Sequence, residues 1–186
     1  MTESREKQNL KDHILEQVLD TEKFKAFYLK KPERTRMMST LLIFHPEGIT
    51  ICGDLCPSRG GNCSAYGYGI GWFSGHLDGD YLCQKFLDKS WQSDLAAEWC
   101  LEEAGRQKEE GHQDIADKLE TLGKRDLECG DMDCRDFYET LTDIDQSYVD
   151  DGVPGHGYNS GEKAWLCAIQ ERFAELYKLH AEGKEA

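Results

Sequence analysis

The chain has 186 residues and a formal net charge of −14, from 36 acidic and 22 basic residues. Such an acidic surface argues against binding to nucleic acid, which needs a basic footprint, and against binding to anionic membranes. The sequence has no run of 18 apolar residues, and residues 1–7 lack the apolar segment of a signal peptide. We therefore expect a cytoplasmic protein.

The first half of the chain predicts a helix followed by short strands. Apolar residues at helical spacing predict a helix over residues 3–20. Alternating apolar residues predict a strand over residues 23–29, and an apolar run predicts another over residues 37–44. A tight turn at Gly48 joins the second strand to a third over residues 49–53. We expect these last two strands to form a hairpin in an antiparallel sheet.

The glycine-rich stretch that follows predicts an irregular segment. Residues 56–71 include five glycines and predict a long loop, and residues 70–73 predict a short edge strand. Asp78 or Asp80 is placed to cap a helix that ends near Lys89, because an aspartate accepts hydrogen bonds from first-turn amides.

From residue 93 onward the periodicity is helical. Four helical segments are expected, at residues 94–110, 113–122, 132–148 and 163–180. We therefore expect one α+β domain over residues 1–186. It has a small antiparallel sheet with flanking helices in residues 1–92 and a helical C-terminal half in residues 93–186.

Three cysteines raise the question of a metal site. Cys52, Cys56 and Cys63, with His45 nearby, are residue types that bind zinc. Their spacing lacks the close Cys-x2-Cys pairs of zinc ribbons, so we expect no stoichiometric zinc, no other cofactor, and reduced thiols. A zinc-stabilised adaptor is the alternative.

The segment from Tyr66 to Trp72 alternates aromatic or apolar residues with glycine. It fits neither the Rossmann fingerprint nor the P-loop, so it does not identify a nucleotide site. Tyr66, Tyr68 and Trp72 are candidate partner-binding residues, because tyrosine and tryptophan dominate binding hot spots. The alternative is a core role for Trp72 and Phe73, with one ring buried and the other half-exposed.

Asp54, His76 and Lys85 are polar residues that could converge near this segment. No nucleophile stands at a recognisable spacing from a base, so we expect no catalytic residues and no enzyme activity. A small-molecule or nucleotide-signal binder or enzyme, with a pocket lined by Asp54, Tyr66, Tyr68 and Lys85, is the alternative function.

Residues 126–151 form an acidic window with ten carboxylates against Arg135, a net charge of −9. The stretch lacks the Gly and Glu positions of an EF-hand loop. A solvated helix face is the simplest explanation, and a surface that enters a basic groove of a partner, as phosphates would, is the sharper one. The candidate partner-binding carboxylates are Asp131, Asp133, Asp136, Glu139, Asp143 and Asp145.

The first half combines a basic segment leading into an apolar strand over residues 34–44 with a Gly53-Asp54 step, a Trp72-Phe73 pair and a Tyr81-x-x-x-Lys85 helix. This combination resembles small accessory proteins encoded by tailed phages and prophages, over residues 34–89. The resemblance implies a protein that acts inside an infected bacterium on host machinery, in the manner of inhibitors of CRISPR and other defence complexes. It implies no catalytic residues.

The expected function is therefore that of a non-enzymatic phage accessory protein. It would bind and inhibit or modulate a host protein, such as a nucleic-acid-handling defence complex, through its acidic surface. It would not contact nucleic acid or membrane directly.

Overall fold

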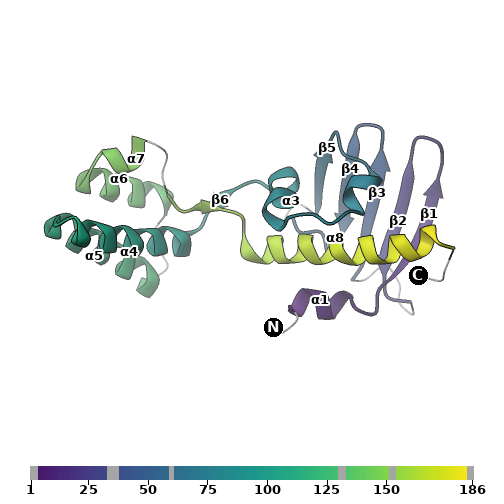
Figure 1. Ribbon diagram of the computed structural model, residues 1–186, viewed down its shortest axis with the longest axis horizontal. Coiled ribbons are helices and arrows are strands. Elements are labelled where there is room, and N and C mark those ends of the chain that lie inside the picture. The colour runs from purple at the N-terminus through teal and green to yellow at the C-terminus, as the bar shows by residue number, and fades with distance from the viewer. Residues whose placement is uncertain (1–3, 33–37, 59–60, 130–132, 151–153, 184–186) are drawn as a thin grey trace. The chain divides into compact units, whose positions relative to one another are not determined.

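The structure is a computed structural model that describes residues 4–32, 38–58, 61–129, 133–150 and 154–183. The chain forms two compact units (Figure 1). We call residues 1–88 and 160–186 the sheet unit and residues 89–159 the helical unit. The α+β fold class expected from the sequence is confirmed. The sequence predicted that all helices after residue 92 belong to the C-terminal half. In the structure the last of them, within residues 160–186, belongs to the sheet unit.

The sheet unit is built on one antiparallel sheet whose strands follow one another in chain order. The expected hairpin is present, with Ile49 and Ile51 fully buried and Thr50 and Cys52 half-buried on the opposite side. The strands are β1 (Ile14–Asp20), β2 (Lys25–Lys30), β3 (Thr40–His45), β4 (Gly48–Gly53) and β5 (Asn62–Tyr66).

The helices of the sheet unit are α1 (Arg5–Leu10), α2 (Ile70–Phe73), α3 (Gly79–Phe86) and α8 (Ser160–Ala181). The expected cap of α3 is Asp78, whose carboxylate accepts hydrogen bonds of 3.0 Å from the amides of Asp80 and Tyr81.

Aromatic side chains join α8 to the sheet. Phe173 of α8 lies with its ring centroid 5.7 Å from Phe27, 5.3 Å from Phe44 and 5.5 Å from Phe73. Gln170, one turn earlier, donates hydrogen bonds from Nε2 to the carbonyls of Phe73 (2.8 Å) and Gly75 (2.7 Å). Apolar burial and paired polar groups therefore both hold α8 to this unit.

The helical unit contains α4 (Ser93–Glu109), α5 (Gln113–Cys129), α6 (Cys134–Ile144), α7 (Ser147–Asp150) and a two-stranded pairing of β6 (Ser90–Trp91) with β7 (His156–Gly157). Its buried core draws on four helices. The core residues are Ala96, Cys100, Ala104, Leu119, Leu122, Phe137, Leu141 and Val149.

Three local expectations were wrong. Residues 14–20 are strand β1 rather than helix, residues 62–66 are strand β5 rather than loop, and residues 70–73 are helix α2 rather than an edge strand. The first two segments gain ladder hydrogen bonds and cross-strand contacts from a neighbouring strand, and such tertiary pairing overrides local pattern. No helix within the described residues is long and apolar enough to cross a membrane.

Candidate functional site

Helix α6 and the residues at its two ends carry most of the described carboxylates of the acidic window. Asp133 caps it, accepting hydrogen bonds of 2.9 Å from the amides of Arg135 and Asp136. Asp145 follows its end and accepts a hydrogen bond of 2.9 Å from the amide of Ser147, and this bond lowers the pKa of the Asp145 carboxyl. Both carboxylates therefore help to define where helices begin. Asp131 lies outside the described residues.

Three exposed carboxylates share one side of α6: Asp136, Glu139 and Asp143. Spacings of three and four residues place side chains on one face of a helix. The other side of α6 carries Phe137 and Leu141, which are fully buried in the core of the helical unit. We call the three carboxylates the α6 acidic face. The sequence predicted these residues as candidates, and the helix aligns them.

Helix α6 itself contributes one cation beside the α6 acidic face. Arg135 donates a hydrogen bond of 3.0 Å from Nε to Glu139 Oε1, and both side chains are well exposed to solvent. A pair this exposed is strongly screened and leaves most of the negative field of the face in place.

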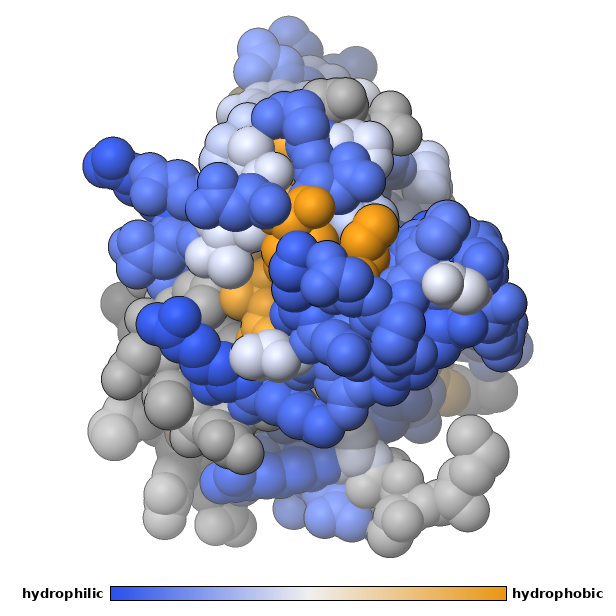
Figure 2. All heavy atoms as spheres, turned by 90° about the vertical axis from the view of Figure 1, so that its left-hand side faces the viewer, coloured by the Kyte–Doolittle hydropathy of each residue, from blue (hydrophilic) through white to orange (hydrophobic). Residues whose placement is uncertain are grey.

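A groove of about 460 Å³ runs between α5 and α6 and borders the acidic face. Asp143 belongs to both. Ile144 and the buried side chain of Leu122 provide apolar lining. The remaining lining residues are polar or charged: Asp114, Asp117, Lys118, Thr121, Arg125 and Thr140. Figure 2 shows this pattern on the helical unit, where a small area of hydrophobic atoms is surrounded by hydrophilic side chains.

The candidate aromatic residues lie in the sheet unit. Tyr66 ends β5 and is 71 % exposed, more than any other large apolar or aromatic residue in the described part of the chain. Tyr68 packs its ring against Trp72, with centroids 4.2 Å apart, and its hydroxyl lies 3.3 Å from the hydroxyl of Tyr81. Trp72 is half-buried and Phe73 fully buried, so this pair divides into one core ring and one partly exposed ring.

Lys85 completes this aromatic cluster. Its ammonium lies 4.9 Å from the ring centre of Tyr81 and 5.8 Å from that of Tyr68, within the range of cation–π attraction. The hydrogen bond from Tyr81, helped by Lys85, lowers the pKa of the Tyr68 hydroxyl, and the same bond raises the pKa of Tyr81. We call Tyr68, Trp72, Tyr81 and Lys85 the aromatic cluster.

Asp54 has a structural role in this arrangement. Its Oδ2 accepts a hydrogen bond of 3.0 Å from the amide of Met38, which fixes the approach of the chain to β3. The structure thus pairs Asp54 with backbone, while Lys85 lies over the tyrosine rings.

The cysteines near β4 do not form a metal centre in the described part of the chain. There, no group of three His, Cys, Asp or Glu side chains is arranged to hold an ion. His45 Nε2 lies 3.3 Å from the Thr50 hydroxyl, and Cys52 donates to the carbonyl of Leu41 at 3.8 Å. Cys56 and Cys63 lie close together, with sulfurs 3.9 Å apart.

The groove between α5 and α6 was not predicted from the sequence. The sequence placed Leu122 and Ile144 in two separate predicted helices. Their spacing did not indicate that the two helices would lie side by side and form one groove. Comparisons with protein-family models, with curated proteins and with solved structures give no match to this chain.

Proposed function

We propose that the protein is a binding protein that engages a partner protein through the α6 acidic face and the adjoining groove. The observation that supports this most directly is the alignment of Asp136, Glu139 and Asp143 on one exposed face beside a groove with some apolar lining. Charged groups around an interface steer association and select partners, while apolar contacts contribute affinity. A basic segment with an apolar side chain matches both features.

Charge spacing favours a partner that normally binds nucleic acid. Along the axis of α6 the three carboxylates are separated by three and four residues, or about 4.5 and 6 Å. A DNA strand carries one phosphate per about 3.4 Å of axis, so the α6 acidic face is a row of negative charge about two thirds as dense as that strand. The resemblance to phage accessory proteins supports a bacterial host protein as the partner, with a nucleic-acid-handling defence complex as the leading class.

The test is affinity capture from bacterial lysate with matched variants. One variant neutralises the α6 acidic face (D136N/E139Q/D143N). The control neutralises three exposed carboxylates of α4 (E98Q/E102Q/E109Q), so it has the same net charge and alters the same unit. The proposal predicts at least one host protein that wild type and control capture about tenfold more than the α6 variant does.

Equal capture by all three proteins would contradict the proposal, as would capture that falls equally in both variants. The second result would assign binding to overall charge rather than to a surface. Circular dichroism of each variant checks that the helices remain folded.

The aromatic cluster supports a second candidate, the binding of a nucleotide or similar small molecule. Partly exposed rings stack on bases, and Lys85 could pair with a phosphate. Titration of the whole protein with a panel of cyclic and linear nucleotides, read by calorimetry, tests it. Saturable heat that disappears in Y68A and K85M would support this function, and no heat at millimolar nucleotide would reject it.

A further inference from the structure

Cys56 and Cys63 form a close pair of free thiols at the edge of the sheet. Their sulfurs are 3.9 Å apart. Cys63 is buried on β5, the edge strand, opposite Ile51 of β4. Cys56 is half-buried in the connection that leads from β4 to β5. Cys56 is therefore partly accessible to a reagent, and Cys63 is buried next to it.

The surroundings give the two sulfurs different chemistry. The hydrogen bond from Cys63, supported by the backbone at Ser58, lowers the pKa of Cys56 to about 7. Burial of Cys56 and the nearby carboxylate of Glu162 oppose this effect. The same hydrogen bond and burial raise the pKa of Cys63. In its neutral form the Cys56 thiol donates to the carbonyl of Ile51 at 3.5 Å.

We propose that Cys56 and Cys63 are a reversible dithiol–disulfide site whose substrate is a small disulfide of the glutathione class. The division of roles follows from accessibility. Attack by a thiolate requires a sulfur that the reagent can reach, and the most effective attacking thiol has a pKa near the ambient pH. Cys56 meets both conditions, and Cys63 is positioned to resolve the product.

The thiol–disulfide exchange takes place in two steps. The Cys56 thiolate attacks one sulfur of oxidised glutathione, the S–S bond of glutathione breaks, and one glutathione leaves as a thiolate. Cys63 then loses its proton to solvent and attacks Cys56 Sγ in the mixed disulfide, which releases the second glutathione. The protein loses two hydrogens and becomes oxidised, and glutathione disulfide is reduced to two thiols.

The required movement is small. A disulfide has an S–S distance of about 2.05 Å, so the sulfurs must approach by about 2 Å from their present separation. The bond would close a ring within the connection between β4 and β5 and tie β5 to the start of that connection. This inference is independent of the proposed binding function.

The test uses the full-length protein and oxidised glutathione at pH 7. Trypsin cleaves after Arg59, between the two cysteines, so the disulfide would appear as two linked peptides in the mass spectrum. We expect the wild type to lose two hydrogens and give this linked pair, and a reductant to reverse the change. C63S should instead retain one glutathione on Cys56, and C56S should gain neither the ring nor the adduct at this site.

Two controls separate this site from general thiol reactivity. C134S removes a half-buried cysteine of the helical unit and should leave the linked pair unchanged. In the wild type, Cys56 should react with iodoacetamide at pH 7 at least about tenfold faster than Cys52, whose pKa is raised by burial. Wild type that keeps a glutathione adduct, that forms a disulfide between other cysteines instead, or that stays reduced would overturn the proposal.

Discussion

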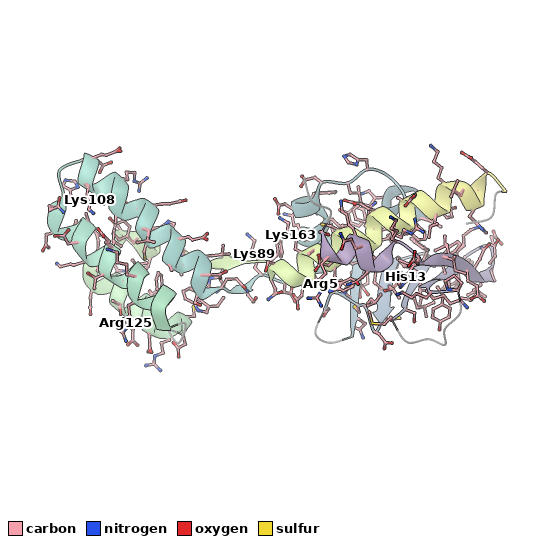
Figure 3. The ribbon with its side chains drawn as sticks, turned by 90° about the horizontal axis from the view of Figure 1, so that it is seen from below. Arg5, His13, Lys89, Lys108, Arg125 and Lys163 are labelled. Carbon is pink, nitrogen blue, oxygen red and sulfur yellow. The ribbon has the colours of Figure 1, made fainter. Side chains whose placement is uncertain are left out.

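At the scale of single residues, the sheet unit contains a buried histidine that should make the stability of the protein depend on pH. His13 is fully buried between α1 and β1 and its Nε2 lies 2.9 Å from the carbonyl of Met38 (Figure 3). That carbonyl can only accept, so Nε2 carries the proton. Its Nδ1 is buried without a hydrogen-bond partner. Protonation would place a buried N–H and a positive charge there.

The pKa of His13 is lowered from its ordinary value of 6.5, first by burial and then by the nearby charges of Lys31 and Arg172. The folded state therefore binds the proton more weakly than the unfolded state. The resulting stability is fully present above pH 6.5 and is lost progressively as the pH falls from 6.5 toward the folded-state pKa.

We therefore predict that the urea concentration at the unfolding midpoint of the wild type decreases when the pH is lowered from 7.5 to 5.5. The decrease should be smaller in H13Q. Glutamine retains a donor for the carbonyl of Met38 but does not titrate. The exposed His76 supplies the control, since H76Q should keep the wild-type pH dependence. Identical pH profiles for wild type and H13Q would show that His13 does not carry this effect.

At the scale of elements, α8 is held to the sheet unit by polar bonds as well as aromatic packing. Gln170 is buried and donates to two carbonyls, one at the last residue of α2 and one just after it. Arg172 donates to the backbone carbonyls of Lys11 and His13, at the start of the sheet. These bonds connect segments about 100 or more residues apart in sequence.

Replacing Gln170 with leucine should lower the free energy of unfolding by about 2–4 kcal/mol, because the carbonyls of Phe73 and Gly75 would lose their donors inside the protein. Urea denaturation followed by circular dichroism measures this. The matched change Q84L, at an exposed position of α3, should alter stability by less than about 0.5 kcal/mol. A Q170L protein as stable as Q84L would contradict the assigned role.

The sequence predicted the elements that depend on local signals. The hairpin of β3 and β4 follows from alternation around Gly48, and the start of α3 follows from the capping carboxylate of Asp78. Residues 14–20 could not be assigned this way, because their apolar residues fit a helix as well as a strand. A bulge between Gln17 and Leu19 also breaks the alternation of β1. Its pairing with β2 decides the outcome.

The candidate site shows the same division. The carboxylates and aromatic rings were identifiable from composition, because their residue types are those that interfaces use. Their positions relative to one another could not be predicted. The groove forms only because α5 and α6 lie side by side. The Cys56–Cys63 pair depends on strand β5, which the glycine-rich sequence did not indicate. Contacts between distant segments depend on tertiary packing and leave no fixed spacing in the sequence.

At the scale of the whole molecule, the net charge of −14 sets which partners can approach. Nonspecific binding to duplex DNA depends on basic side chains that displace counterions from phosphates. We predict no gel shift of a duplex at physiological salt with protein up to about 10 µM, a concentration at which many nonspecific DNA-binding proteins do bind. Salt-sensitive retardation below that concentration would contradict this prediction.

In the binding function proposed above, the α6 acidic face steers the approach of a partner protein. The most direct test measures the association kinetics of the protein captured from lysate, at 0.1 M and 1 M salt, where the screening length is about 10 Å and 3 Å. We predict that D136N/E139Q/D143N and high salt each slow association about tenfold, that E98Q/E102Q/E109Q has a much smaller effect, and that dissociation changes little. Association that is insensitive to salt and unchanged by the α6 substitutions would show that this face does not steer the partner.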